Sequence, residues 1–389
     1  MGVCLLFACF GTTLATWAVH LPTLQHVTGM TTAMVGTVLL TSGIGALVGM
    51  QVCGVLLDRL SGPSVTLSAG MAMAVSVLVL LAAATTAGAL VGALLFGVAT
   101  GAADVSMNAA AIGVERAYGR PIMASFHAVF SLGSAAGSLL ATVAFAFHLP
   151  ALAAAAAVSV LVVTVLAAIS RWLVGFTLRA GDDGVQNEDP VAIPPARKAA
   201  SLHRVVVLGL LAFLLLLSEG GAMDWSSLHA QQHFAANPAV GSLAFGCFVT
   251  AMTLGRFCVD RIVARIGAAA VVRSGCALAT LGIGTVIVAP AISVALVGWL
   301  LFGLGLSGGI PQVFTAAGGA GEGSNQVLAR VVGMGYVAML AGPALIGWLA
   351  QVSSINNALL LPLCATTVCV LAAAAVGPRD TANRKDCAA

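Results

Sequence analysis

Charged residues are the scarcest feature of this sequence. They make up 7% of its 389 residues, against 60% hydrophobic residues, and the mean hydropathy is +1.07. A soluble domain carries about 25% charged residues, so the composition excludes an ordinary soluble protein and indicates several membrane-spanning helices. The formal net charge of +3 comes with no basic face interleaved with aromatic residues, which excludes a nucleic-acid partner.

Sequence motifs of enzymes and metal sites are missing as well. The chain has no P-loop, no G-x-S-x-G and no His–Cys metal spacing, and its nine cysteines include no C-x-x-C pair. We therefore expect no enzyme activity, no cofactor and no metal. The turns are too short and too neutral to build the catalytic cluster of a lipid-acting membrane enzyme. A sensor that does not transport stays an alternative, which uptake into vesicles would separate from a carrier.

Twelve apolar segments of membrane-spanning length recur between polar turns. They cover roughly residues 3–21, 33–57, 64–85, 89–114, 121–147, 151–174, 204–229, 239–258, 268–289, 292–317, 326–350 and 356–377. One long polar segment divides them six and six. We predict an all-α integral membrane protein with an N-terminal bundle (1–178), a linker (179–202) and a C-terminal bundle with a short tail (203–389). Met1 leads almost directly into the first span, so we expect no cleavable signal and leave open a longer N-terminus.

The basic residues predict the orientation. All 16 lie at or near even-numbered turns or in the C-terminal tail: Arg59, Arg116, Arg120, Arg171, Arg179, Arg197, Lys198, Arg204, Arg256, Arg261, Arg265, Arg273, Arg330, Arg379, Arg384 and Lys385. The odd-numbered turns, such as His20–Thr32 and His229–Val240, have none. By the positive-inside rule, both termini and the linker are cytoplasmic. We expect a monomer in a bacterial cytoplasmic (inner) membrane.

The two halves of the sequence also repeat. Leu94–Gly97 recurs as Leu300–Gly303, and Asp58-Arg59 recurs as Asp260-Arg261, in each case about 200 residues later. Such parallel halves are typical of transporters made of two pseudo-symmetric six-helix bundles. In that plan the solute site lies between the halves, near the middle of the membrane.

Several segments resemble a known family. Gly54-x-x-x-Asp58-Arg59 and Gly255-Arg-Phe-Cys-Val-Asp260-Arg261 resemble the loop signature G-x-x-x-D-R-x-G-R-R of the major facilitator superfamily, although Ser61–Ser64 replaces the small-and-basic end of the first copy. The resemblance covers essentially the whole chain. Further segments are similar to the YbjJ-type branch, distant relatives of fucose:proton symporters: Asp104-x-x-Met107-Asn108, Val114-Glu115, Gly119–Met123, Phe126-His127, Ser131-x-Gly133 and Glu219–Ser226.

The resemblance implies a cytoplasmic gate at the loop after span two. In the family plan Asp58 lies at the N-terminus of span eleven, where the helix dipole favours an anion. Arg59 pairs with an acid at the end of span four, which here is best matched by Glu115. These contacts close the inside while the outside is open. The full set of gate residues that we predict is Gly54, Asp58, Arg59, Glu115, Arg116, Asp260 and Arg261.

Polar stripes mark the predicted transport site. Asp104, Asn108 and Glu115 share one helix face, and His127 and Ser131 share a face of the next helix. An ionisable group in hydrocarbon costs several kcal/mol unless it faces protein or water, so Asp104 is predicted to be functional. The alternative is a protonated carboxyl group satisfied by a neighbouring helix. We predict proton coupling at Asp104, with Asn108 and His127 as polar partners; Glu219 of span seven is the rival.

The predicted solute-binding residues come from both halves: Trp17, Asn108, His127, Ser131, Asp224, Trp225 and Gln312. Trp17 fits an interfacial aromatic belt equally well, and Asp224 lies close enough to the outer surface to be merely solvated. Glu219 and Asp224 differ by about 140° around a straight helix, so both line one cavity only if Gly220-Gly221 distort it.

The solute class is predicted from an absence. The sequence places no Lys or Arg deep in a span, and an anionic solute would then find no fixed cation to replace its hydration. We therefore favour a small neutral polar or cationic solute, preferably sugar-like, carried with protons by alternating access. The alternative is proton-driven efflux of a drug or metabolite. The partners are then the solute, protons and the lipid bilayer.

Overall fold

The computed structural model describes residues 1–118, 122–180, 202–318 and 324–377. Within these ranges twelve helices are long and apolar enough to cross a membrane, and no strand occurs. The predicted all-α architecture of twelve spans in two bundles is confirmed. Most of the predicted linker, 179–202, lies outside the described residues, as do the side chains of Arg116 and Asp260.

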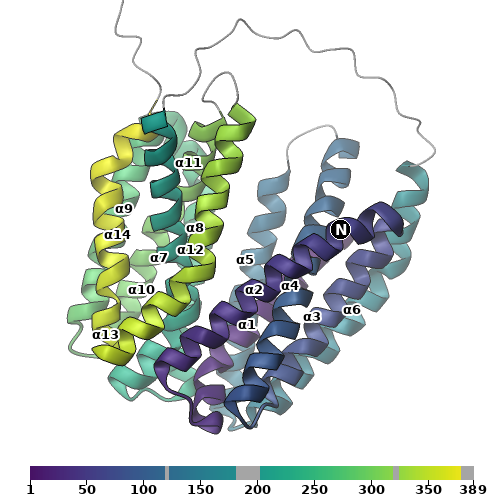
Figure 1. Ribbon diagram of the computed structural model, residues 1–389, viewed down its shortest axis with the longest axis horizontal. Helices are drawn as coiled ribbons and strands as arrows, with labels where there is room; N and C mark the ends of the chain where they lie inside the picture. The colour runs from purple at the N-terminus through teal and green to yellow at the C-terminus, as the bar shows by residue number, and fades with distance from the viewer. Residues whose placement is uncertain (119–121, 181–201, 319–323, 378–389) are drawn as a thin grey trace, which may run out of the picture.

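The N-terminal half consists of six helices that alternate in direction (Figure 1). Their bounds are α1 (Gly2–Thr28), α2 (Thr32–Arg59), α3 (Gly62–Leu81), α4 (Thr86–Tyr118), α5 (Met123–Ala146) and α6 (Ala151–Ala180). Helix α2 packs along α4, and α1 packs along α5. The turns are short and begin with helix-starting residues: Thr31 caps α2 by accepting the N–H of Met34, and Pro63 is near the start of α3.

The C-terminal half contains eight α-helices that make up the other six spans. They are α7 (Leu202–Phe234), α8 (Pro238–Ile266), α9 (Ala268–Val288), α10 (Ile292–Leu306), α11 (Gly309–Gly318), α12 (Ser324–Val352), α13 (Ile355–Ala358) and α14 (Leu360–Ala372), followed by the 3₁₀ turn η1 (Ala373–Val376). Span ten is interrupted at Ser307-Gly308, between α10 and α11. By contrast, α7 continues unbroken through Gly220-Gly221, so the distortion considered there does not occur.

The two halves meet along two seams, α2 against α12 and α5 against α8. The α2–α12 seam is close-packed because it is built on glycine: a Cβ on Gly36 would lie 3.1 Å from the Ala344 Cα and from the Pro343 carbonyl oxygen. In the α5–α8 seam the Ser138 hydroxyl donates to the Ser242 carbonyl oxygen at 2.7 Å. These contacts all lie in the parts of the helices far from the linker.

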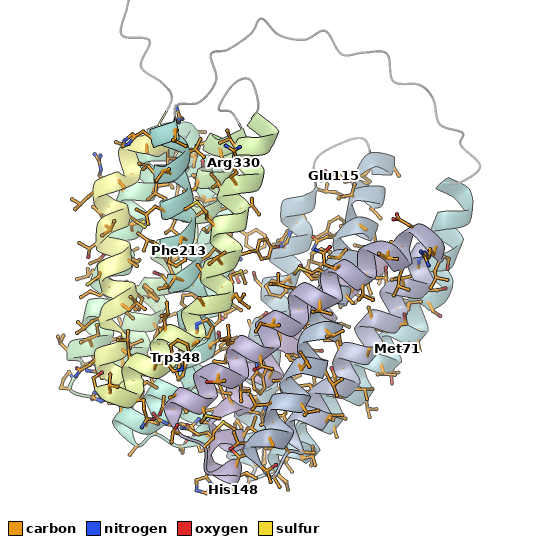
Figure 2. The ribbon with its side chains drawn as sticks, in the orientation of Figure 1. Met71, Glu115, His148, Phe213, Arg330 and Trp348 are labelled. Carbon is orange, nitrogen blue, oxygen red and sulfur yellow. The ribbon has the colours of Figure 1, made fainter. Side chains whose placement is uncertain are left out.

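At the linker end, where α6 ends and α7 begins, the halves diverge (Figure 1). Figure 2 shows Glu115 of α4 and Arg330 of α12 at this end, one in each half, and His148 at the opposite end. The last turn of α2 makes no close contact with the other half: Asp58 and Arg59 are exposed, and a Cβ on Gly54 would meet nothing within 4 Å. The halves therefore pack together at the end opposite the linker, called here the closed end, and diverge at the linker end, called here the open end.

Candidate functional site

The polar residues of the interior fall into two groups, and each group includes residues from both halves. The first group centres on Asp104, near the middle of α4. The Asn108 amide donates to the Asp104 carboxylate at 3.1 Å and to the Asp104 carbonyl oxygen at 2.9 Å. Both side chains are partly buried. The i,i+4 spacing therefore brings Asn108 against Asp104, while the coupling role predicted for them stays a prediction.

Asp104 also faces a residue that the sequence analysis missed. Tyr336 of α12, in the opposite half, interacts electrostatically with the Asp104 carboxylate, and its side chain is 41% exposed. The chain contains only two tyrosines, and this one lies inside predicted span eleven. A tyrosine in the middle of an apolar span is amphipathic and needs a partner for its hydroxyl, and this signal could have identified Tyr336 from the sequence.

The second group is an ion pair inside the membrane region. The Arg256 guanidinium of α8 donates to the Glu219 carboxylate of α7 at 2.9 Å, with side chains 25% and 15% exposed. Arg256 lies three residues before the end of the candidate span Pro238–Val259, near the turn where the pattern of basic residues places it, and its guanidinium reaches Glu219 inside the bundle. The expectation that an anionic solute would find no fixed cation does not hold, because this side chain places one beside Glu219. An intramembrane ion pair facing the bundle interior marks a functional region by default.

Arg256 also reaches across the interface. Its second terminal nitrogen lies 3.5 Å from the hydroxyl of Ser131 on α5, a long hydrogen bond to the other half. His127, one turn away on α5, is exposed, packs edge-on against Phe7 and interacts electrostatically with Arg256. Of the two partners predicted for Asp104, His127 therefore belongs with Arg256 instead. Ser131 is fully buried, and its own hydroxyl lies 3.2 Å from the His127 carbonyl oxygen.

The two predicted tryptophans are not in either group. Trp17 is 3% exposed and packs against Phe96, 5.9 Å between ring centroids, so it faces neither lipid nor the interface groups. Trp225 is fully buried, and the tip of its ring lies against Gly347 of α12, close to the α2–α12 seam. In this structure both tryptophans are packing residues of the closed end.

Asp224 and Gln312 lie apart from the two groups. Asp224 is partly buried on α7, and within the described ranges nothing donates a hydrogen bond to its carboxylate. Gln312 is 7% exposed in α11, just after the break in span ten. Because α7 is unbroken, Asp224 and Glu219 point to different sides of the helix.

The gate residues are spread apart at the open end. Glu115 accepts the backbone N–H of Ile122 at 2.7 Å, which ties the end of α4 to the start of α5. Arg59 is exposed and does not pair with Glu115 here, while Arg261 is exposed on α8. Gate contacts were predicted for the state in which this end is closed, so the pairing of Arg59 with Glu115 stays a prediction. Arg116 and Asp260 have side chains outside the described part.

Comparison with known families decides the identity. The family model of the Major Facilitator Superfamily matches residues 1–321. The chain belongs to the Major Facilitator Superfamily. It is therefore a transporter of the membrane and not an enzyme, as predicted.

Relatives and solved structures agree with this placement. The chain is 33% identical over 355 residues to an uncharacterised transporter of the same superfamily from Yersinia pestis. The alignment covers 91% of this chain and 89% of the relative. A bacterial homologue of the human lysosomal transporter Spinster, solved inward-facing and occupied, superposes with a TM-score of 0.71 at 13% identity, covering 96% of this chain and 94% of the other. A D-xylose–proton symporter gives a TM-score of 0.70 at 13% identity, covering 97% of both chains. At such identities the structural likeness shows the fold alone.

Proposed function

We propose that this superfamily member is a proton-coupled secondary transporter that moves a small polar solute by alternating access. The observation that carries the proposal is the environment of Asp104. It lies near the middle of a membrane-spanning helix, at the interface of the two halves, and its carboxylate accepts from an amide and, among the residues that the structure describes, pairs with no cation. An uncompensated carboxylate in a membrane is costly, so proton binding and release at Asp104 follow its access to water.

Glu219 is the weaker candidate for this role. Its carboxylate already has a fixed positive partner in Arg256, and a proton on Glu219 would leave that guanidinium uncompensated. The favoured solute is sugar-like in size and polarity, which agrees with a D-xylose–proton symporter having the same fold. Because the Arg256 guanidinium lies beside Glu219 inside the bundle, the lack of a fixed cation is no longer a reason to exclude anionic solutes. Proton-driven efflux remains the alternative direction, since the same site serves both.

We further propose that the structure is the inward-open state of a monomer in a bacterial inner membrane, with the linker and both termini in the cytoplasm. The distribution of basic residues supports this orientation, and the halves diverge at the linker end (Figure 1). A similar structure of the fold was solved inward-facing. The assignment to the YbjJ-type branch remains our proposal and rests on the Asp104–Asn108, Phe126-His127 and Glu219–Ser226 segments.

The test is a two-step screen of the purified protein. A thermal-shift screen against sugars, polyols, nucleosides and amines finds the solute, because a ligand that binds only the folded state raises its stability. The protein is then reconstituted into vesicles that contain a pH-sensitive dye. We expect addition of the solute to move protons in the same direction as the solute. Solute uptake without any proton movement would contradict the coupling.

A further inference from the structure

Two side chains that form cations lie near each other at the interface of the halves. Arg256 of α8 reaches Ser131 of α5 at 3.5 Å, and His127 lies one turn before Ser131 on the same helix and interacts electrostatically with Arg256. The other neighbour of the His127 ring is Phe7, which cannot titrate. Among the described residues the His127 ring makes no hydrogen bond and has no interaction with Asp104 or Glu115 of α4. Its nitrogens are therefore available to a ligand.

The Arg256 guanidinium is also only partly used. It has five N–H groups in a planar fork, which suits the two oxygens of a carboxylate. One of its terminal nitrogens donates to Glu219 and the other reaches Ser131 at the long distance of 3.5 Å. Its side chain is 25% exposed, although it lies inside a span. An anion in front of it would meet further N–H groups, with the His127 ring on the facing half.

The charges of this part of the site limit the net charge of its ligand. Glu219 offsets Arg256, so this part of the site is neutral when His127 is neutral. A protonated His127 adds one positive charge, which one negative charge on the ligand balances. A dianion would leave a negative charge unbalanced, because no third cation lies in this group within the described residues. The charge balance therefore selects a monoanion that binds together with one proton.

Resting on the proposed transport function, we propose that Arg256 and His127 bind the carboxylate of a hydroxylated monocarboxylic acid, a solute of the sugar-acid class. The hydroxyl groups of such a solute are matched by the first group, which offers the amide and carboxylate of Asn108 and Asp104 on α4 and the phenol of Tyr336 on α12. Because the carboxylate contacts one residue from each half, it opposes the repulsion between Arg256 and a protonated His127. Binding therefore draws the linker ends together, as alternating access requires.

The Arg256–His127 part of the site holds one more proton with the acid bound than when empty, on His127, and this proton is distinct from the one proposed for Asp104. By linkage, affinity for the acid then falls as the pH rises, by at most tenfold per pH unit, the limit for one linked proton. The groups that face His127 and Arg256 are Phe7 of α1, Ser131 of α5 and Glu219 of α7. Glu219 keeps its ion pair with Arg256 in this scheme.

The experiment uses purified full-length protein and matched solutes that differ in charge. Gluconate, glucuronate and galacturonate are each compared with the neutral sugar or polyol of the same skeleton, at equal ionic strength and at pH 6 and 8. The unfolding midpoint is recorded against solute concentration. We expect at least one acid to raise the midpoint, its neutral counterpart to do so at least tenfold more weakly, and the acid to bind more weakly at pH 8.

Variants assign the effect to the two residues. Arg256→Gln alone leaves Glu219 unpaired, so the Arg256→Gln/Glu219→Gln double variant, which removes the whole ion pair, is tested beside it. Both should abolish the shift by the acid. His127→Gln should weaken binding and remove its pH dependence, whereas His148→Gln, at the far end of the protein (Figure 2), should change neither.

Three results would overturn the proposal: no acid in the panel raises the midpoint, the neutral counterparts bind as well as the acids, or the double variant still binds the acid. The proposed transport function fails in a different way. It fails if the protein binds solutes of either class but reconstituted vesicles take up none of them. Proton-coupled uptake of a neutral sugar, with no binding of its acid, would support the proposed transport function and contradict the proposed sugar-acid solute.

Discussion

Asp104 lies near the middle of α4 in the N-terminal half and Glu219 near the middle of α7 in the C-terminal half, and their surroundings differ. Asp104 accepts a hydrogen bond from an amide of its own helix and faces a phenol across the interface. Glu219 is bound to a guanidinium, and that guanidinium also contacts the opposite half. A guanidinium is a fixed positive partner for a carboxylate, whereas an amide is not. The comparison therefore supports the proposal that Asp104 carries the proton and that Glu219 holds Arg256.

The largest expected difference between the two acids is in stability. Glu219→Gln leaves the Arg256 charge uncompensated and should lower the free energy of unfolding by about 3 kcal/mol, at the low end for a broken buried pair because Arg256 is a quarter exposed. Asp104→Asn breaks no ion pair and should cost less than about 1 kcal/mol. Denaturation in detergent by increasing dodecyl sulfate measures both. Equal losses would remove the distinction between the acids.

The double variant Arg256→Gln/Glu219→Gln serves as the control for this stability measurement. Because both charges are removed together, it should recover most of the loss seen with Glu219→Gln alone. Additive losses in the double-mutant cycle would mean that the two residues do not interact.

The α2–α12 seam at the closed end should control how far apart the linker ends lie. Gly36→Val places side-chain atoms against the Ala344 and Pro343 backbone, and overpacking of this kind costs about 1–3 kcal/mol. The cost falls on the state with this end closed, so the linker ends should approach one another. Spin-label distances across the linker ends measure this shift. Gly54→Val, where the added atoms meet nothing, is the matched control, and an equal shift there would contradict the account.

Gate substitutions should change turnover and spare both acids. Asp58 and Arg59 are exposed in this state and reach neither group, so Asp58→Asn or Arg59→Ala acts on the conformational equilibrium alone. We expect turnover to fall by about tenfold, with ligand affinity changed by less than about twofold. Comparable loss of affinity in both variants, with turnover otherwise intact, would count against the predicted gate.

Thiol labelling of introduced cysteines tests the orientation on which the inward-open assignment depends. These cysteines should not affect Asp104 or Glu219. A cysteine at Asn237, which caps α8 at the end opposite the linker, should react with an impermeant thiol reagent from outside intact cells. A cysteine at Val185, in the predicted linker, should react only after the membrane is permeabilised. The reverse pattern would invert the topology.

The sequence predicted well what depends on local pattern. Hydropathy identified all twelve spans, and i,i+4 spacing placed Asn108 against Asp104. Arg256 could not be placed in the same way. A charge next to the end of an apolar run normally marks the end of a span, and that position alone does not reveal the contact with Glu219, 37 residues earlier. That pairing depends on how α7 packs against α8, which periodicity does not contain. His127 was predicted to be a partner of Asp104 because the sequence likewise does not show how α5 packs against α8.

The central claim, that Asp104 carries the coupling proton, is tested most directly by the Asp104→Asn variant in vesicles with an imposed proton gradient. The asparagine keeps a polar group beside Asn108 and cannot bind and release a proton. We predict that this variant no longer accumulates solute against its gradient but still exchanges labelled for unlabelled solute. Accumulation that persists in Asp104→Asn and is lost in Glu219→Gln would contradict the account and assign the proton to Glu219.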